Sequence, residues 1–115
     1  MGTYLYLAPE VLQGKPYNTS VDVFSFALVL LEVSLSNARW VEDNISSKFS
    51  YIKGKRPPIP TDLVESSPEL VAIITGGWDK DPTIRPEFLE IEPRIAAVEP
   101  KAEEITALPS TQSLT

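Results

Sequence analysis

Of the side chains suited to acid–base or metal chemistry, the 115 residues of this sequence include carboxylates but no histidine and no cysteine. Histidine is the commonest general base at neutral pH and the commonest metal ligand, and the cysteine thiolate is a frequent nucleophile and zinc ligand. Ser-His-Asp hydrolysis, Cys-His chemistry and ordinary zinc sites are therefore excluded as native activities. The carboxylates with a distinctive setting are Glu10 after a proline, Asp22 at a helix start, and Asp79 and Asp81 shortly before Arg85.

A long helix must position Asp22, and the sequence predicts it from about Thr19 to Leu35. Thr19 is the expected N-cap, with Asp22 as a short capping-box partner near the positive end of the helix dipole. The residues that follow are apolar on every face, which is typical of a central, buried helix. Their β-branched and aromatic content leaves a strand as the alternative, and the length favours the helix. The apolar residues are Val23, Phe24, Phe26, Leu28, Val29, Leu30, Leu31 and Val33.

Shorter elements are expected before and after this helix. Residues 1–18 should form a loop with one helical turn, which begins at Pro9 and ends at Gly14. A weaker helix is expected at about residues 44–53. Gly54 should end it, and an extended proline-rich segment follows.

The C-terminal part of the chain contains two more expected helices. Ser67 and Pro68 mark the start of the first, as its N-cap and its first helical residue. The second spans about residues 86–98 and should be interrupted or kinked near Pro93. Residues 99–115 are dominated by proline, glutamate, serine and threonine, which predicts a disordered tail.

Length and charge limit the class of protein. The chain is one domain at most and has a formal net charge of -6. This charge argues against a nucleic-acid or anionic-membrane surface, and the short basic cluster at residues 53–56 is expected to be a solvated helix end. The longest uncharged apolar run, Val23 to Leu31, is too short to span a bilayer, and no signal-peptide pattern opens the chain. We therefore expect a cytoplasmic protein in a reducing compartment, with no membrane span and no nucleic-acid partner.

The order of three short motifs makes the chain similar to a known family. Ala8-Pro9-Glu10 stands near the start, Asp22 opens the long helix soon after, and Arg85-Pro86 stands near the end. In this order and at these distances they resemble the second half of a protein kinase domain, over about residues 2–98. The run Asp22-Val23-Phe24-Ser25-Phe26 and the segment 53–60 also look like parts of that family.

The resemblance implies a fold class and a subgroup. The fold is mainly α: the helical C-lobe subdomain of the protein kinase fold, lacking the N-lobe and the catalytic loop, in residues 1–98. Gly2-Thr3 resembles serine/threonine kinases, whereas Trp78 with Asp81-Pro82 resembles tyrosine kinases. Such a mixture is typical of the tyrosine-kinase-like group, whose members mostly phosphorylate serine and threonine.

The resemblance also implies roles for single residues. Glu10 and Arg85 would form a buried ion pair that ties the activation segment to the last helices; the alternative is two solvated charges. Asp22 would accept backbone N–H groups of the catalytic loop, and the alternative is an ordinary helix-start carboxylate. Thr3 would lie in the substrate-binding loop and hydrogen-bond the catalytic Asp and Lys, or else be an ordinary loop threonine.

The other family positions are structural, and the chemistry of the family lies elsewhere. Ala8 and Pro9 belong to the first motif, and Trp78 and Phe88 are expected in the core rather than against a ligand. Phosphoryl transfer needs a glycine-rich loop, a strand lysine, a catalytic-loop Asp and Asn, and a metal-binding Asp, all of which precede the Ala-Pro-Glu motif. ATP and magnesium belong to the intact family. We expect no catalytic, cofactor-binding or metal-binding residue in this chain and no ATP binding by the chain alone.

Two classes of function follow from the resemblance. The chain is either the C-terminal piece of a serine/threonine kinase, inactive alone, or a non-catalytic interaction module derived from a kinase C-lobe. An unrelated small helical bundle is a third alternative. In each kinase-derived case we expect poor stability alone and a need for a protein partner or the missing kinase segment. The face of the long helix expected to lack partners carries some of Val23, Phe24, Phe26, Leu30 and Leu31.

Overall fold

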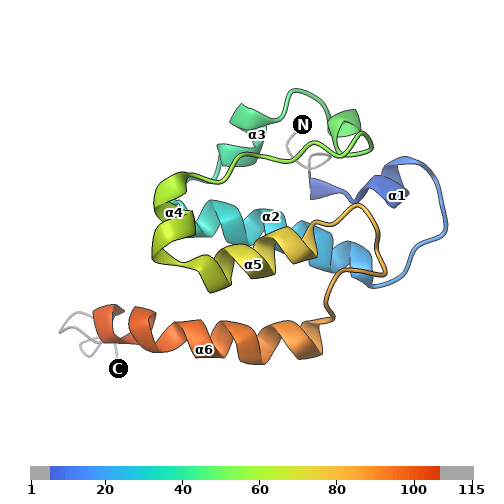
Figure 1. The fold of residues 1–115 in the computed structure, drawn as a ribbon. Helices are drawn as coiled ribbons and strands as arrows, with labels where there is room; N and C mark the ends of the chain where they lie inside the picture. Colours follow the sequence, from blue (N-terminus) through green and yellow to red (C-terminus); the bar gives the residue numbers. More distant parts are fainter. Residues whose placement is uncertain (1–5, 107–115) are drawn as a thin grey trace.

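The structure, a computed structural model, describes residues 6–106. In this part of the chain it consists of helices and loops, without a strand. The helices lie in three layers, with α1 and α3 on one side, α2 and α5 in the middle, and α6 on the other side (Figure 1). The elements are α1 (Pro9–Leu12), α2 (Ser20–Ser34), α3 (Trp40–Asn44), the 3-10 turn η2 (Lys48–Ser50), α4 (Thr61–Ser66), α5 (Pro68–Gly77) and α6 (Phe88–Thr106).

Helix α2 is the centre of the fold, as its apolar sequence predicts. It packs along α5, and the two helices approach closely at Gly77. A Cβ atom on Gly77 would lie 2.9 Å from the Cβ of Ala27, so the absence of a side chain permits this approach. Phe24 and Leu28 of α2 are completely buried. They belong to the main core, which also includes Ala8, Leu31, Val41, Tyr51, Ile74 and Trp78.

A smaller cluster attaches α6 to the other side of α2. It joins Val23 of α2, Ile73 of α5 and Ile91 of α6, all of them almost completely buried. The rings of Phe26 and Phe88 meet edge to face beside it, with their centroids 5.5 Å apart. Helix α6 is therefore held through its first turns, where Phe88 and Ile91 contact the middle layer while Leu89 is exposed.

The expected bare face of α2 is covered, and a different face is exposed. Val23, Phe24 and Leu31 are buried, and α5 and α6 partly cover Phe26 and Leu30. The exposed apolar side chains of α2 are Val29, which is 45% exposed, and Val33, which is 68% exposed. These two valines lie one helical turn apart, so they form one stripe on the surface.

The start of α2 differs in detail from the expected capping box. The helix begins at Ser20, and Thr19, at the N-cap, makes no side-chain cap hydrogen bond. Asn18 accepts a hydrogen bond from the Ser20 N–H instead, at 2.9 Å from its Oδ1. Asx side chains readily make this local bond, which competes with capping by the next residue. Asp22 is exposed and caps nothing.

The prediction of a helix at about residues 44–53 is wrong. Helix α3 ends at Asn44, whose side-chain amide donates a hydrogen bond to the Trp40 carbonyl at 2.9 Å. The next residue, Ile45, has an extended backbone and is buried. A short 3-10 turn, η2, follows instead of a helix. Burial of Ile45 and Tyr51 in the main core outweighs the local helix preference of this stretch. Helix α4, which was not expected, lies beside α5.

The other expected boundaries agree better with the structure. Gly14 follows α1 with a φ of 70°, a left-handed conformation that stops the helix at low cost for glycine. Pro68 begins α5, although Ser67 makes no side-chain cap hydrogen bond. No helix in residues 6–106 is both long and apolar enough to cross a membrane.

Helix α6 is longer than predicted. It continues through Pro93 to Thr106, where the sequence predicted a disordered tail from residue 99. Strong helix formers (Lys101, Ala102, Glu103 and Glu104) follow Pro100 and favour this continuation. Residues 107–115 of the expected tail lie outside the described residues.

Candidate functional site

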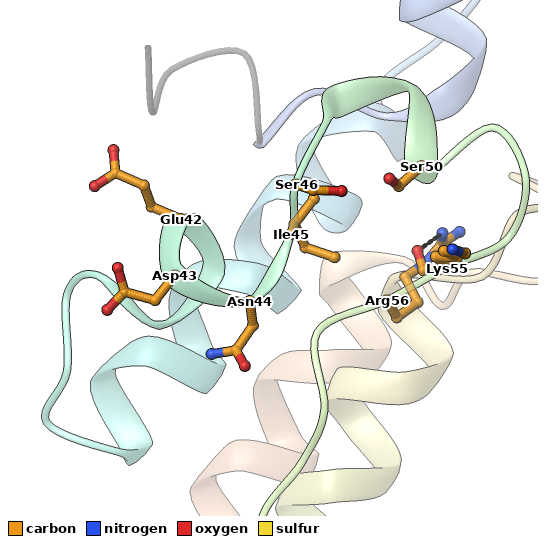
Figure 2. A pocket seen from close by; sticks show the side chains of 8 residues that line it. All are labelled: Glu42, Asp43, Asn44, Ile45, Ser46, Ser50, Lys55 and Arg56. Carbon is orange, nitrogen blue, oxygen red and sulfur yellow. Dashed lines mark hydrogen bonds between the residues drawn. The ribbon is translucent and has the colours of Figure 1, made fainter.

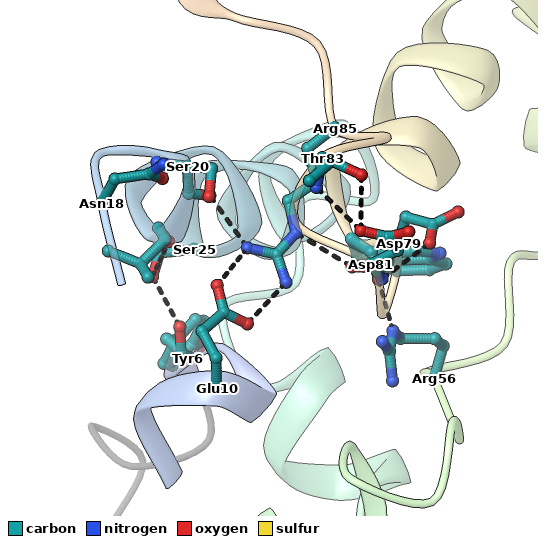
Figure 3. Close-up of polar contacts among 12 residues, drawn as sticks. Tyr6, Glu10, Asn18, Ser20, Ser25, Arg56, Asp79, Asp81, Thr83 and Arg85 are labelled. Atoms are coloured by element: carbon teal, nitrogen blue, oxygen red, sulfur yellow. Dashed lines mark hydrogen bonds and ion pairs between the residues drawn. The ribbon is translucent and has the colours of Figure 1, made fainter. Parts of the chain in front are cut away.

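The centre of the candidate site is the contact between Glu10 and Arg85, which lie 75 residues apart in the sequence (Figure 3). Glu10 lies in the first turn of α1, where Pro9 occupies the first helical position. Arg85 follows a loop that is shaped by two carboxylates. Asp79 accepts a hydrogen bond from the Asp81 N–H, and Asp81 accepts hydrogen bonds from the backbone and hydroxyl of Thr83.

The two side chains form a buried, two-point ion pair. Arg85 donates from Nη1 to one carboxylate oxygen of Glu10 at 2.7 Å and from Nη2 to the other at 2.9 Å. Their side chains are 0% and 8% exposed. Arg85 also donates to the carbonyls of Ser20 at 3.1 Å and Asp79 at 2.9 Å. The structure thus places Glu10 and Arg85 as a buried pair, which connects α1, the start of α2 and the 79–85 loop.

Burial and pairing act in opposite directions on Glu10. Burial alone would raise the pKa of this carboxyl, but the hydrogen bonds from Arg85 and from backbone, together with the nearby positive charges, hold the pKa below its ordinary value. Glu10 is therefore ionised at neutral pH. Removing one partner of a buried pair typically costs about 3–5 kcal/mol, because the other charge is left uncompensated.

A second arginine, Arg56, lies beside this pair and was not expected in the interior. The guanidiniums of Arg56 and Arg85 each lie 5.1 Å from the centroid of the Phe24 ring, at cation–π distance. Arg56 donates to the carbonyls of Trp78 at 2.7 Å and Tyr51 at 3.1 Å. Burial lowers the pKa of Arg56. The basic cluster at residues 53–56 is thus not wholly solvated. The resemblance of segment 53–60 to the family was the sequence feature that could have indicated a structural role for Arg56.

The other residues that the sequence singled out differ in their burial and contacts. Ala8, Pro9 and Trp78 are buried, as expected of structural positions. Phe88 is 43% exposed and packs its ring edge against Phe26 rather than filling the core. Asp22 is exposed, and its side chain has no hydrogen bond among the described residues. Thr3 lies outside the described residues.

The pocket in Figure 2 is lined by acidic side chains of α3 and by the basic side chains of Lys55 and Arg56. It encloses about 440 Å³ between α3 and residues 55–56. Glu42 and Asp43, on one side of it, form exposed ion pairs with Arg39 at 2.8 and 3.6 Å. No group of three or more acidic side chains within residues 6–106 is arranged to hold a metal ion.

The motifs around Glu10 and Arg85 agree with a family-wide pattern. The family model described as protein tyrosine and serine/threonine kinase matches residues 2–95, which include both partners of the ion pair. The chain belongs to the protein kinase family. Its helical fold and its motif order are those expected for the C-lobe part of a kinase domain.

Individual kinases are similar over most of this chain. The dual specificity protein kinase shkC of Dictyostelium discoideum is 42% identical over 93 residues, which cover 78% of this chain and 18% of shkC. The serine/threonine-protein kinase STY17 of Arabidopsis thaliana is 37% identical over 101 residues, covering 78% and 16%. The serine/threonine/tyrosine-protein kinase HT1 of the same plant is 33% identical, covering 100% and 29%. This kinase chain thus spans less than a third of the length of these relatives.

Proposed function

We propose that this chain is the C-terminal part of a serine/threonine kinase catalytic domain and is inactive alone. The observation that carries the proposal is the buried Glu10–Arg85 pair, which joins the Ala-Pro-Glu motif to the Arg-Pro motif of the matched family. Its place in an intact kinase would be to hold the end of the activation segment against the helical subdomain. The reaction of the intact protein is ATP-dependent phosphoryl transfer to serine or threonine of a protein.

The nucleotide chemistry belongs to segments outside this chain in our proposal. In an intact kinase, ATP supplies the phosphoryl group and magnesium neutralises its charge. In the family the groups that hold them are a glycine-rich loop, a strand lysine, the catalytic-loop Asp and Asn and a metal-binding Asp, which precede the Ala-Pro-Glu motif. We therefore derive no catalytic step from this chain. Its own contribution is to position Thr3 for the protein substrate and Asp22 for the catalytic loop.

A second candidate function is a non-catalytic interaction module. The observation that favours it is the exposed stripe of Val29 and Val33 on the central helix. The unpartnered Asp22 precedes Val29 by two helical turns on the same helix. Such a stripe suits either the missing kinase segment or another protein. In both cases we place the protein in the cytoplasm, with a protein partner and without nucleic acid.

An exchange chimera tests which function applies. The 93-residue region of shkC that aligns with this chain is replaced by the aligned part of this chain, and phosphoryl transfer to a protein substrate is measured. Activity within about tenfold of shkC, which corresponds to about 1.4 kcal/mol in the barrier, supports the kinase function. A chimera that folds and binds nucleotide but transfers no phosphate contradicts it and favours the interaction module.

Two matched variants show whether a loss of activity in the chimera comes from the loss of the ion pair. Glu10→Ala in the chimera should abolish most activity, because Arg85 loses its buried partner. Glu69→Ala removes an exposed carboxylate at the start of α5 and should leave activity unchanged. Equal effects of the two substitutions would contradict the role given to the ion pair.

A further inference from the structure

Helix α6 has an exposed apolar side, away from the side that holds it to the fold. The helix forms the outer layer on its side of the molecule (Figure 1). Ile91 is buried against α2 and α5, and Ile95 packs beside it. Leu89 points away from this contact and is 84% exposed, and Ile84 in the preceding loop is 60% exposed. Large apolar side chains at the start of α6 are therefore in contact with solvent.

Two opposite charges lie beside these apolar side chains. Glu90 and Arg94 are one helical turn apart, and their side chains are 62% and 34% exposed. The ion pair between them is long, at 3.5 Å, and an exposed pair of this kind contributes little to stability. Both residues border a hollow of about 680 Å³, which Ile84 and Leu89 also line. The hollow leaves room beside Glu90 for a second guanidinium group.

The order of the two charges indicates which partner fits this surface. Along α6 the acidic residue comes first and the basic residue follows one turn later, so a partner with charges of one sign would repel one of them. A second copy of α6 that runs antiparallel presents the reverse order. When the two helices cross at residue 92, Glu90 of each copy faces Arg94 of the other. Such a reciprocal match is the property of a two-fold symmetric contact.

Small residues let two α6 helices approach each other at this crossing. Pro93 and Ala97 are exposed and lie on the same side of α6 as Leu89. Their short side chains suit an interaxial distance of about 8–10 Å. Leu89 of each copy then covers Pro93 and Ala97 of the other, which removes apolar surface from water. Glu92 lies about 160° around the helix from Arg94, so its charge stays outside the contact.

We propose that α6 is a homodimerisation helix, through which two copies of this chain pair in antiparallel orientation. Leu89 makes the apolar contact, and Glu90 and Arg94 form ion pairs between the copies. The surface is distinct from the exposed stripe of Val29 and Val33 on α2. Because the contact is two-fold symmetric, it closes at two copies. Dimerisation of this kind does not depend on the kinase reaction proposed above.

Sedimentation velocity over a range of protein concentrations tests the dimer. Val33→Lys in the 115-residue chain disrupts the stripe on α2, so we expect a reversible monomer–dimer equilibrium without larger species. Adding Leu89→Lys should weaken the dimer at least about tenfold, because a charge replaces apolar contact surface. Val64→Lys, at an exposed position on α4, is the matched control and should leave the dimer unchanged. A monomeric Val33→Lys protein, or equal effects of the other two substitutions, would overturn the proposal.

A mixing experiment tests the ion pairs between the copies. Glu90→Arg and Arg94→Glu each place like charges across the contact, so each variant alone should be monomeric in the Val33→Lys background. An equimolar mixture brings opposite charges together at both pairs, and a heterodimer should form. Neither variant keeps the Glu90–Arg94 pair within its own helix. Recovery of the dimer on mixing therefore reports a contact between chains and not the stability of one helix.

Two control variants separate this local effect from the change in net charge. Lys53→Glu and Glu65→Arg alter the net charge by the same amounts at exposed positions away from α6. Each control should dimerise alone as well as it does in the mixture. Variants of Glu90 and Arg94 that dimerise as tightly alone as together, or a mixture of them that stays monomeric, would overturn the proposal.

Discussion

Arg85 places both terminal nitrogens of its guanidinium on the carboxylate of Glu10, at 2.7 and 2.9 Å, although 75 residues separate them. Because both side chains are buried, Glu10→Ala and Arg85→Ala should each reduce the free energy of unfolding by about 3–5 kcal/mol. The double variant should lose much less than the sum. Chemical denaturation of the unmodified exchange chimera, its two single variants and the double variant measures this cycle. Additive losses would show that the two residues act independently.

The pH dependence of stability follows from the same carboxyl. The folded pKa of Glu10 lies below its ordinary value of 4.5, so the ionised form is favoured by folding. Its contribution is complete above about pH 4.5 and is lost as the pH falls through the folded pKa. Glu10→Gln should remove this part of the acid sensitivity and lower stability at pH 7. An unchanged slope of stability against pH in the Gln variant would contradict the pairing.

Tyr51 carries a buried hydroxyl without a hydrogen-bond partner among residues 6–106. The side chain is completely buried, and burial raises the pKa of its hydroxyl. Its ring meets Phe24 edge to face at 5.4 Å, so the ring rather than the hydroxyl stabilises the fold. Tyr51→Phe should leave stability unchanged or raise it by up to about 1 kcal/mol, since an unsatisfied polar group is removed. A loss above about 1 kcal/mol in thermal or chemical unfolding would reveal a partner for that hydroxyl.

The valine stripe of α2 should behave as a contact surface. Val33→Lys should reduce self-association and dye binding of the isolated chain, because Val33 is 68% exposed and forms part of an apolar patch. In the exchange chimera the same change should destabilise the protein, because there the stripe contacts the kinase segment that this chain lacks. Val64→Lys, at a 42% exposed position on α4, is the control and should do neither. Sedimentation velocity and thermal unfolding report the two effects.

Local sequence patterns predicted the helices whose formation depends on residues near one another in the sequence. The apolar run after Thr19 indicated α2, and Ser67 with Pro68 indicated α5. They did not predict the region around Ile45 and Tyr51, because burial in the main core decides its conformation.

Long-range polar contacts were predictable only where a family motif marks them. The Glu10–Arg85 pair was expected from the resemblance, since no local pattern links two residues so far apart. Glu32 stands inside an apolar helix and belongs to none of the family-like motifs, so its contacts with Tyr6 and Val41 are visible in the structure alone. Arg56 was assigned to the solvent because a run of basic residues is usually exposed.

Calorimetric titration with magnesium–ATP tests the central claim most directly, namely that this chain is part of a kinase whose nucleotide site lies outside it. The 115-residue chain and the exchange chimera are titrated under the same conditions. We expect a saturable heat of binding for the chimera and none for the chain. Saturable, magnesium-dependent binding by the 115-residue chain would contradict it.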